Sequence, residues 1–121
     1  MTTIKVTGIN VLALYVTELE RSLEFYTQQL GFEKIRDMDP GVLLSAGELT
    51  VYMEGGRPVR EVTYSQEFSP CLAVDSVKGA YDALSKAGVE MAMKYQEFTP
   101  EFAMFIVKDP DGLKVEFAGK P

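Results

Sequence analysis

The chain contains no histidine, a single cysteine and fewer basic than acidic residues. The absence of histidine removes both the commonest general base and the commonest transition-metal ligand of proteins. Cys71 alone cannot form a disulfide within the chain, and a lone thiol fits the reducing cytoplasm, where we expect this protein to act. The net charge of −6 argues against nucleic acid or an anionic membrane as the main partner, because both attract clustered Lys and Arg.

Long apolar runs are also missing from the sequence. The longest have the length of a strand, whereas a membrane-spanning helix needs about 20 apolar residues. The first residues lack the basic and then apolar pattern of a signal peptide. A hydrophobic content of 46% is ordinary for a soluble globular protein, and 121 residues suit one domain with a real core. We therefore expect one domain that spans residues 1–121.

The second half of the chain repeats the pattern of the first half. The corresponding residues are Val16 and Val74, Leu19 and Val77, Tyr26 and Leu84, and Gly31 and Gly88. A solenoid needs at least about three short repeats, so two long copies indicate a duplicated supersecondary unit instead. Paired units often build a shared site between them, and the repeat therefore indicates where to search for function.

Each copy predicts the order strand, helix and three strands. In the first copy a β-rich run at 9–16 precedes a possible capping box at 17–20, and Gly31 ends a helix. The apolar face of that helix comprises Leu19, Leu23, Tyr26 and Leu30. Strands are expected at about 33–36, 42–46 and 49–54, and residues 59–68 are expected to form a linker and a strand.

In the second copy a strand at 71–74 leads into a helix at 77–87, capped by Asp75 or Ser76 and closed by Gly88. Strands are expected near 89–95, 103–108 and 113–117, and the turn residues 109–112 join the last two. The prediction is an α+β fold of two βαβββ modules, about 8–56 and 67–118, that form cupped mixed sheets.

Strand alternation predicts which side chains lie on the sheet faces that the helices leave open. The expected open-face residues are Val11, Ala13, Tyr15, Tyr52, Ser69, Cys71, Tyr95, Met104 and Glu116. Two curved sheets related by an approximate twofold axis would enclose a cleft lined by them. Packing in the core is the alternative role for each apolar member of this set.

Several motifs resemble the vicinal oxygen chelate superfamily, which includes glyoxalase I, extradiol dioxygenases and bleomycin-resistance proteins. The motifs are the segments 16–22, 25–26, 30–32, 74–77, 109–112 and 115–117, in the order and spacing of that family. The resemblance implies paired βαβββ modules, usually in a homodimer. It also implies metal-ligand positions at Val11, Ser69 and Glu116, with a fourth near Tyr52 or Glu54.

The residues at these positions depart from the metal-dependent members of the family. Valine cannot coordinate a metal and neutral serine is a poor ligand, whereas a catalytic divalent metal normally has about three protein ligands. We therefore expect neither a metal site nor a cofactor. Cys71 has no histidine to activate it, so an inert thiol is expected there.

Two functions follow from the sequence. The favoured one is a metal-free binding protein for a small amphipathic or aromatic molecule, with Glu116 suited to a positively charged group. The alternative is a lyase, isomerase or dioxygenase that uses oxygen ligands, or that uses Glu116 as a metal-free catalytic base.

Overall fold

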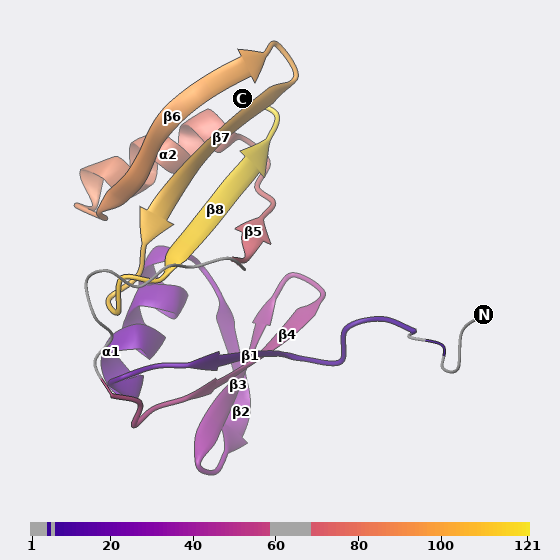
Figure 1. Ribbon diagram of the computed structural model, residues 1–121, viewed down its shortest axis with the longest axis vertical. Helices are drawn as coiled ribbons and strands as arrows, with labels where there is room; N and C mark the ends of the chain where they lie inside the picture. Colours follow the sequence, from indigo (N-terminus) through magenta and orange to yellow (C-terminus); the bar gives the residue numbers. More distant parts are fainter. Residues whose placement is uncertain (1–4, 6, 59–68) are drawn as a thin grey trace. The chain divides into compact units, whose positions relative to one another are not determined.

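The computed structural model describes residue 5 and residues 7–58 and 69–121 of the chain. The chain divides into two units, Met1–Arg57 and Pro58–Pro121, and each is treated by itself. In each unit a helix accompanies a four-stranded mixed sheet (Figure 1). The predicted α+β fold of two βαβββ modules is therefore confirmed, while the strand expected within 59–68 lies outside the described residues.

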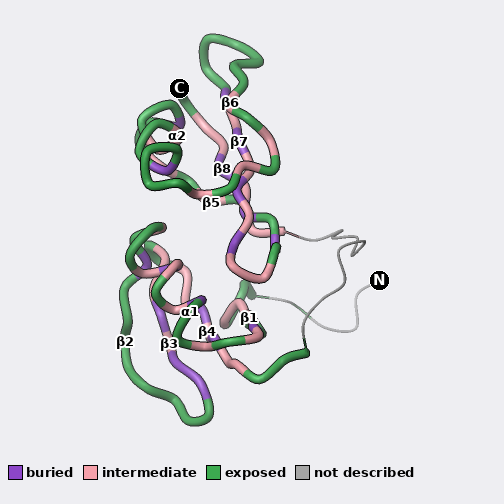
Figure 2. The backbone as a smooth tube through the Cα atoms, turned by 90° about the vertical axis from the view of Figure 1, so that its left-hand side faces the viewer, coloured by how far each residue is buried: buried purple, intermediate pink, exposed green. Residues whose placement is uncertain are grey.

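The sheet of the first unit has the strand order β1-β4-β3-β2. Its strands are β1 (Leu12–Tyr15), β2 (Glu33–Met38), β3 (Gly41–Ala46) and β4 (Leu49–Glu54). Strands β1 and β4 are parallel, and the other neighbours are antiparallel. The edge strand β2 is exposed along its whole length (Figure 2).

The helix of the first unit covers one face of this sheet. It begins as α1 (Leu19–Glu24) and continues as a π-helical segment, η1 (Phe25–Gln29). Gly31 follows with a φ of 77°, a left-handed conformation that glycine adopts without steric cost, so the predicted stop is confirmed. The predicted capping box is wrong, because the N-cap residue is Glu18 and its side chain makes no capping hydrogen bond.

Alternation along the strands sorts the side chains of the first sheet between its two faces. The buried side chains under the helix include Val16, Val42, Leu44, Val51 and Met53, and Tyr26 meets them from η1. The residues between them on β1, β3 and β4 consequently point to the opposite face. That opposite face carries the pocket described below.

The second unit repeats this arrangement with the strand order β5-β8-β7-β6. Its strands are β5 (Cys71–Leu72), β6 (Met91–Thr99), β7 (Phe102–Lys108) and β8 (Lys114–Gly119). Helix α2 (Val77–Lys86) begins after Ser76, whose Oγ accepts a 2.9 Å hydrogen bond from the Gly79 amide. One of the two predicted capping residues is thereby confirmed.

The turn between β7 and β8 is held by a buried aspartate. Oδ1 of Asp109 accepts hydrogen bonds from the amides of Asp111 and Leu113, at 2.9 and 2.8 Å. Gly112 has a φ of 81° and its amide donates to the Asp109 carbonyl oxygen, as a tight turn requires. The turn predicted at 109–112 is confirmed.

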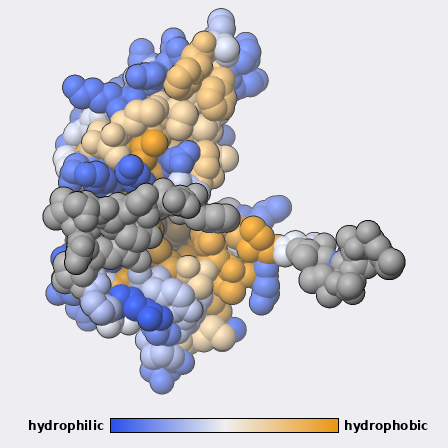
Figure 3. Space-filling model, in the orientation of Figure 1, coloured by the Kyte–Doolittle hydropathy of each residue, from blue (hydrophilic) through white to orange (hydrophobic). Residues whose placement is uncertain are grey.

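An aromatic group forms the core of the second unit. The ring of Phe105 stacks on that of Phe117 with centroids 4.8 Å apart, and it meets Tyr81 of α2 edge-on at 5.2 Å. On the opposite face Met104, Ile106 and Ala118 are half-buried. Figure 3 shows this face of the second sheet as an apolar strip bordered by hydrophilic side chains.

Among the residues that the structure describes, neither helix combines the length and apolar character that a membrane crossing requires.

Candidate functional site

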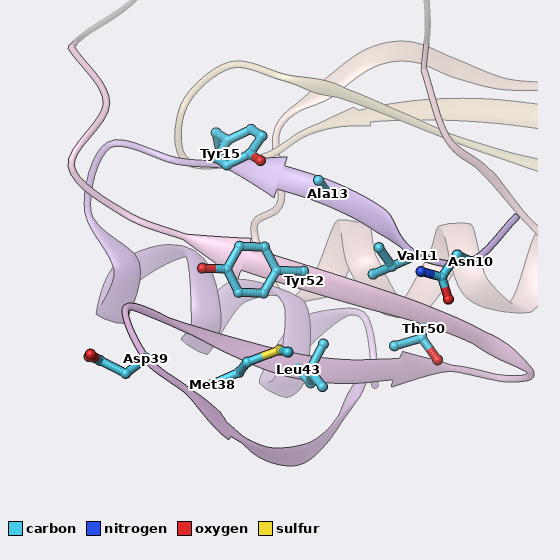
Figure 4. A pocket seen from close by; sticks show the side chains of 9 residues that line it. All are labelled: Asn10, Val11, Ala13, Tyr15, Met38, Asp39, Leu43, Thr50 and Tyr52. Carbon is cyan, nitrogen blue, oxygen red and sulfur yellow. The ribbon is translucent and has the colours of Figure 1, made fainter.

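A pocket of about 490 Å³ opens on the face of the first sheet opposite its helix. Asn10, Val11, Ala13, Tyr15, Met38, Asp39, Leu43, Thr50 and Tyr52 line it (Figure 4). Aliphatic and aromatic side chains predominate, and a few polar groups stand among them. Pockets of this size and composition hold small organic molecules.

Strand pairing places the centre of this lining in one row across the sheet. Tyr52 of β4 lies beside Ala13 on the parallel strand β1 and beside Leu43 on the antiparallel strand β3. Met38 ends the edge strand β2, and Asp39 follows it in the turn to β3. The pocket floor therefore consists of regular sheet, which holds side chains more rigidly than a loop does.

Two neighbours fix the orientation of Tyr52. Gly41 leaves the space that the ring occupies, because a Cβ at Gly41 would lie 2.7 Å from two carbons of the ring. The phenol Oη donates a 2.7 Å hydrogen bond to Oε1 of Glu54, two residues further along β4. The ring and its hydroxyl group are thus both held in place.

The pKa of Tyr52 reflects these surroundings. The hydrogen bond to the Glu54 carboxylate, with smaller contributions from desolvation and from the negative charges of Glu54 and Asp39, raises the pKa of Tyr52 to about 12. The phenol consequently keeps its proton across the physiological range of pH. Tyr52 enters any binding event as a neutral group.

The ring of Tyr15 carries a cation on one side. The guanidinium carbon of Arg57 lies 4.2 Å from the centroid of this ring, within the range of a cation–π interaction. That side of the ring is therefore taken by Arg57, and an aromatic ligand would have to approach the ring from elsewhere.

The structure brings several of the predicted binding residues together in this pocket. Val11, Ala13, Tyr15 and Tyr52 all line it. Asn10, Met38, Asp39, Leu43 and Thr50 also line it but were absent from the expected set. For Leu43 the sequence holds a usable signal, since it alternates with the buried residues Val42 and Leu44.

The remaining predicted residues, apart from Tyr95, lie on the open face of the second sheet. Ser69 Oγ donates a 2.5 Å hydrogen bond to Oε2 of Glu116. Cys71 on β5 pairs with Glu116 on β8, and Met104 is on the neighbouring strand β7. Cys71 is exposed, and desolvation, followed by the charge of Glu116, raises the pKa of its thiol above the ordinary value. A raised thiol pKa leaves little of the nucleophilic thiolate at neutral pH.

Tyr95 lies on the other face of the second sheet, not on the expected open face. Its ring centroid is 5.6 Å from that of Tyr81 on α2, so it packs against the helix. Its hydroxyl group donates to Glu97 at 2.8 Å. The apolar alternation around Tyr95 therefore marks the face that α2 covers.

The strand registers settle which residue of the first unit corresponds to Glu116. Ala13 and Cys71 occupy equivalent positions of the repeat, and they pair with Tyr52 and Glu116 respectively. Tyr52, and not Glu54, is therefore the counterpart of Glu116. Its proton is directed to Glu54, as described above.

Taken one by one, the residues at the implied ligand positions are poor ligands for a catalytic divalent metal. Val11 has no donor atom, the Tyr52 phenol is protonated, and the Ser69 hydroxyl group donates to the only carboxylate of the set, Glu116. Such a metal normally needs about three good ligands and an open position. Within residues 5, 7–58 and 69–121, the structure has no cluster of three or more Cys, Asp or Glu side chains that could hold a metal ion.

Solved structures with the same fold are numerous. A virulence protein from Salmonella typhimurium has a TM-score of 0.76 at 19% identity, with 98% of this chain and 100% of that chain covered. A lactoylglutathione lyase from Agrobacterium tumefaciens has a TM-score of 0.72 at 17% identity, with 95% and 94% covered. A glyoxalase family protein from Enterococcus faecalis has a TM-score of 0.71 at 22% identity, with 93% and 97% covered. Identities this low show a shared fold and leave function open.

No curated protein matches the chain in sequence. Residues 8–117, however, match the family described as the Glyoxalase/Bleomycin resistance protein/Dioxygenase superfamily. The match covers nearly the whole chain and agrees with the two βαβββ modules and with the solved structures. The chain belongs to the glyoxalase/bleomycin resistance protein/dioxygenase superfamily.

Proposed function

We propose that this protein binds a small, mainly apolar molecule that contains an aromatic ring. The molecule binds on the open face of the first sheet, without a metal or a cofactor. The observation that carries the proposal is the pocket of about 490 Å³ with its aliphatic and aromatic lining. Its lining combines Leu43, Val11 and Ala13 with the rings of Tyr15 and Tyr52 and the thioether of Met38. Flat rings and flexible thioethers pack well against aromatic ligands.

The donor set of the family's ligand positions supports binding rather than metal-assisted chemistry. The positions Val11, Tyr52, Ser69 and Glu116 offer a single carboxylate, and hydrogen bonds engage the two hydroxyl groups. Within the first unit, a ligand held in the pocket would meet apolar side chains, hydroxyl groups and one amide, a surface suited to packing and hydrogen bonding. Sequestration or transport of a small molecule is the activity that such a surface can perform.

Calorimetric titration with 1-naphthalenemethanol tests this proposal. A ligand of this size should bind with a dissociation constant on the order of 0.1–1 mM, given the usual affinity per ligand atom. Leu43→Gln should weaken binding by about 3- to 10-fold, because apolar area on the pocket floor is lost. Ile35→Gln is the matched control, since Ile35 is 51% exposed on β2 and outside the pocket lining. Equal weakening by both variants, or no saturable heat for the wild type, would contradict the proposal.

A second candidate function is proton-transfer catalysis by Glu116 as a metal-free base, in a lyase or an isomerase. The observation that favours it is the 2.5 Å hydrogen bond from Ser69 Oγ, because it holds the half-buried carboxylate of Glu116 in one orientation, as a general base requires. Formation of lactoylglutathione, the compound in the name of the Agrobacterium enzyme, is the first reaction to test. Activity that Glu116→Gln reduces by at least about 100-fold would support this function, since a general base contributes that much. Activity that survives the substitution would exclude Glu116 as the base.

A further inference from the structure

The pocket of the first unit ends in groups that accept hydrogen bonds. Asp39 lines this end, and the phenol oxygen of Tyr52 points to the same side (Figure 4). A carboxylate has no proton to give and only accepts hydrogen bonds. The role of the Tyr52 oxygen depends on where its proton lies.

The proton of Tyr52 is committed to Glu54. A phenol has one O–H group, and here that group donates to the Glu54 carboxylate at 2.7 Å. The oxygen still has lone pairs, so it can accept a hydrogen bond from a bound molecule. While the pair with Glu54 persists, Tyr52 can accept from a ligand and cannot donate to it.

The charges around the Tyr52 phenol also favour a ligand group that donates hydrogen bonds. The carboxylates of Glu54 and Asp39 both disfavour negative charge at Tyr52, as the raised pKa of the phenol reflects. Two cations that neighbour pocket residues are outside the lining: Arg57 stacks on the ring of Tyr15, and Arg36 is at the exposed edge strand beside Leu43. Of the described residues that line the pocket, Asp39 is the only charged one.

We propose that the acceptor end formed by Asp39 and Tyr52 selects ligands whose polar group donates hydrogen bonds, an ammonium group above all, on an apolar or aromatic body. Glu54 is the positioning residue, because it fixes the direction of the Tyr52 proton. This inference rests on the function proposed above, and it names the chemical class of ligand for that pocket.

Three probes of nearly equal size separate the two proposals. They are 1-naphthylmethylamine, a cation at pH 7, neutral 1-naphthalenemethanol, and anionic 1-naphthoic acid. The wild type should bind the amine about 3- to 10-fold more tightly than the alcohol, since a hydrogen bond to a charged donor is stronger by about 1 kcal/mol. The acid should bind at least about 10-fold more weakly than the alcohol, because its carboxylate would meet acceptors and like charge.

The variants then locate the source of the selectivity. In Glu54→Gln the Tyr52 hydroxyl group faces a neutral amide, which can donate to it as well as accept from it, so the Tyr52 proton can turn toward a ligand and the preference for the amine over the alcohol should fall to about 2-fold or less. Tyr52→Phe removes the phenol oxygen that accepts the hydrogen bond, so it should also reduce the preference for the amine over the alcohol. Glu24→Gln is the matched control, since it removes one negative charge from an exposed position on α1, and it should leave the preference unchanged.

The measured quantity is the ratio of affinities, which a general loss of structure would not shift in favour of one probe. Equal affinity of the wild type for the three probes would overturn the selectivity while leaving the proposed function standing. An unchanged ratio in both Glu54→Gln and Tyr52→Phe would overturn the assignment to this pair. Failure of all three probes to bind would overturn the proposed function, and this inference with it.

Discussion

Replacing Gly41 by alanine should lower the free energy of unfolding by about 3 kcal/mol, at the upper end of the usual cost of overpacking. The new Cβ would overlap the carbonyl oxygen of Met53 and lie 2.7 Å from the ring of Tyr52. The Met53 carbonyl group belongs to the backbone of β4, so a side-chain rotation cannot relieve this overlap and the strands themselves must shift. Equilibrium denaturation in urea measures the loss.

Gly47→Ala is the control for this substitution. Gly47 has a φ of 62° but open space around a built Cβ, so the variant should lose only the backbone cost of about 1 kcal/mol. Gly41→Ala should also weaken binding of 1-naphthalenemethanol, because the displaced ring of Tyr52 belongs to the pocket. Stability of Gly41→Ala equal to or above that of Gly47→Ala would contradict the described packing of the Met53 carbonyl group and the Tyr52 ring around Gly41.

Replacing Phe105 by alanine should lower the free energy of unfolding by about 3–5 kcal/mol, the usual range for a buried phenylalanine. The side chain is fully buried, between Phe117 and Tyr81 of α2. Its removal deletes both ring contacts and leaves a cavity beneath the helix. Urea denaturation followed by circular dichroism measures the effect.

The same substitution at Phe102 is the control, because this residue is on the same strand and is 42% exposed. It should cost about 1 kcal/mol or less, since its ring contact with Phe98 lies near solvent. Similar costs for the two variants would contradict the placement of Phe105 in the core.

Much of the fold could be predicted from the sequence because the strongest signals are local. Gly31 and Gly88 end helices where the chain needs a positive φ, and the residues 109–112 carry the composition of a tight turn. The prediction of a capping box was wrong because the sequence motif at 17–20 does not by itself determine which residue starts the helix. The helix begins after Glu18, and no side-chain capping bond forms there.

The pocket could be predicted only in part, because pairing between strands decides it. Alternation along the first predicted strand was enough to place Val11, Ala13 and Tyr15 on the open face. Asp39 enters the lining from the turn after β2, a strand whose register shifts between Lys34 and Arg36. Such an irregularity is invisible in the sequence, and so is the space that Gly41 leaves for Tyr52.

Tyr95 shows the reverse problem. The alternation around it correctly indicates a strand but does not say which face is covered. Tyr81 of α2 settles the question by packing against its ring. Alternating apolar residues therefore predict that one face of a strand is buried. Whether a helix or a ligand covers that face has to be found from the helix contacts in the structure.

The most direct test of the account is an amide chemical-shift map of the uniformly labelled protein titrated with 1-naphthalenemethanol. Binding in the pocket predicts saturable shifts centred on Val11, Ala13, Leu43, Thr50 and Tyr52, with little change along α1 on the opposite face of the sheet. Shifts that centre on α1, or that grow linearly without saturating, would contradict the claim that the open face of the first sheet is a binding site.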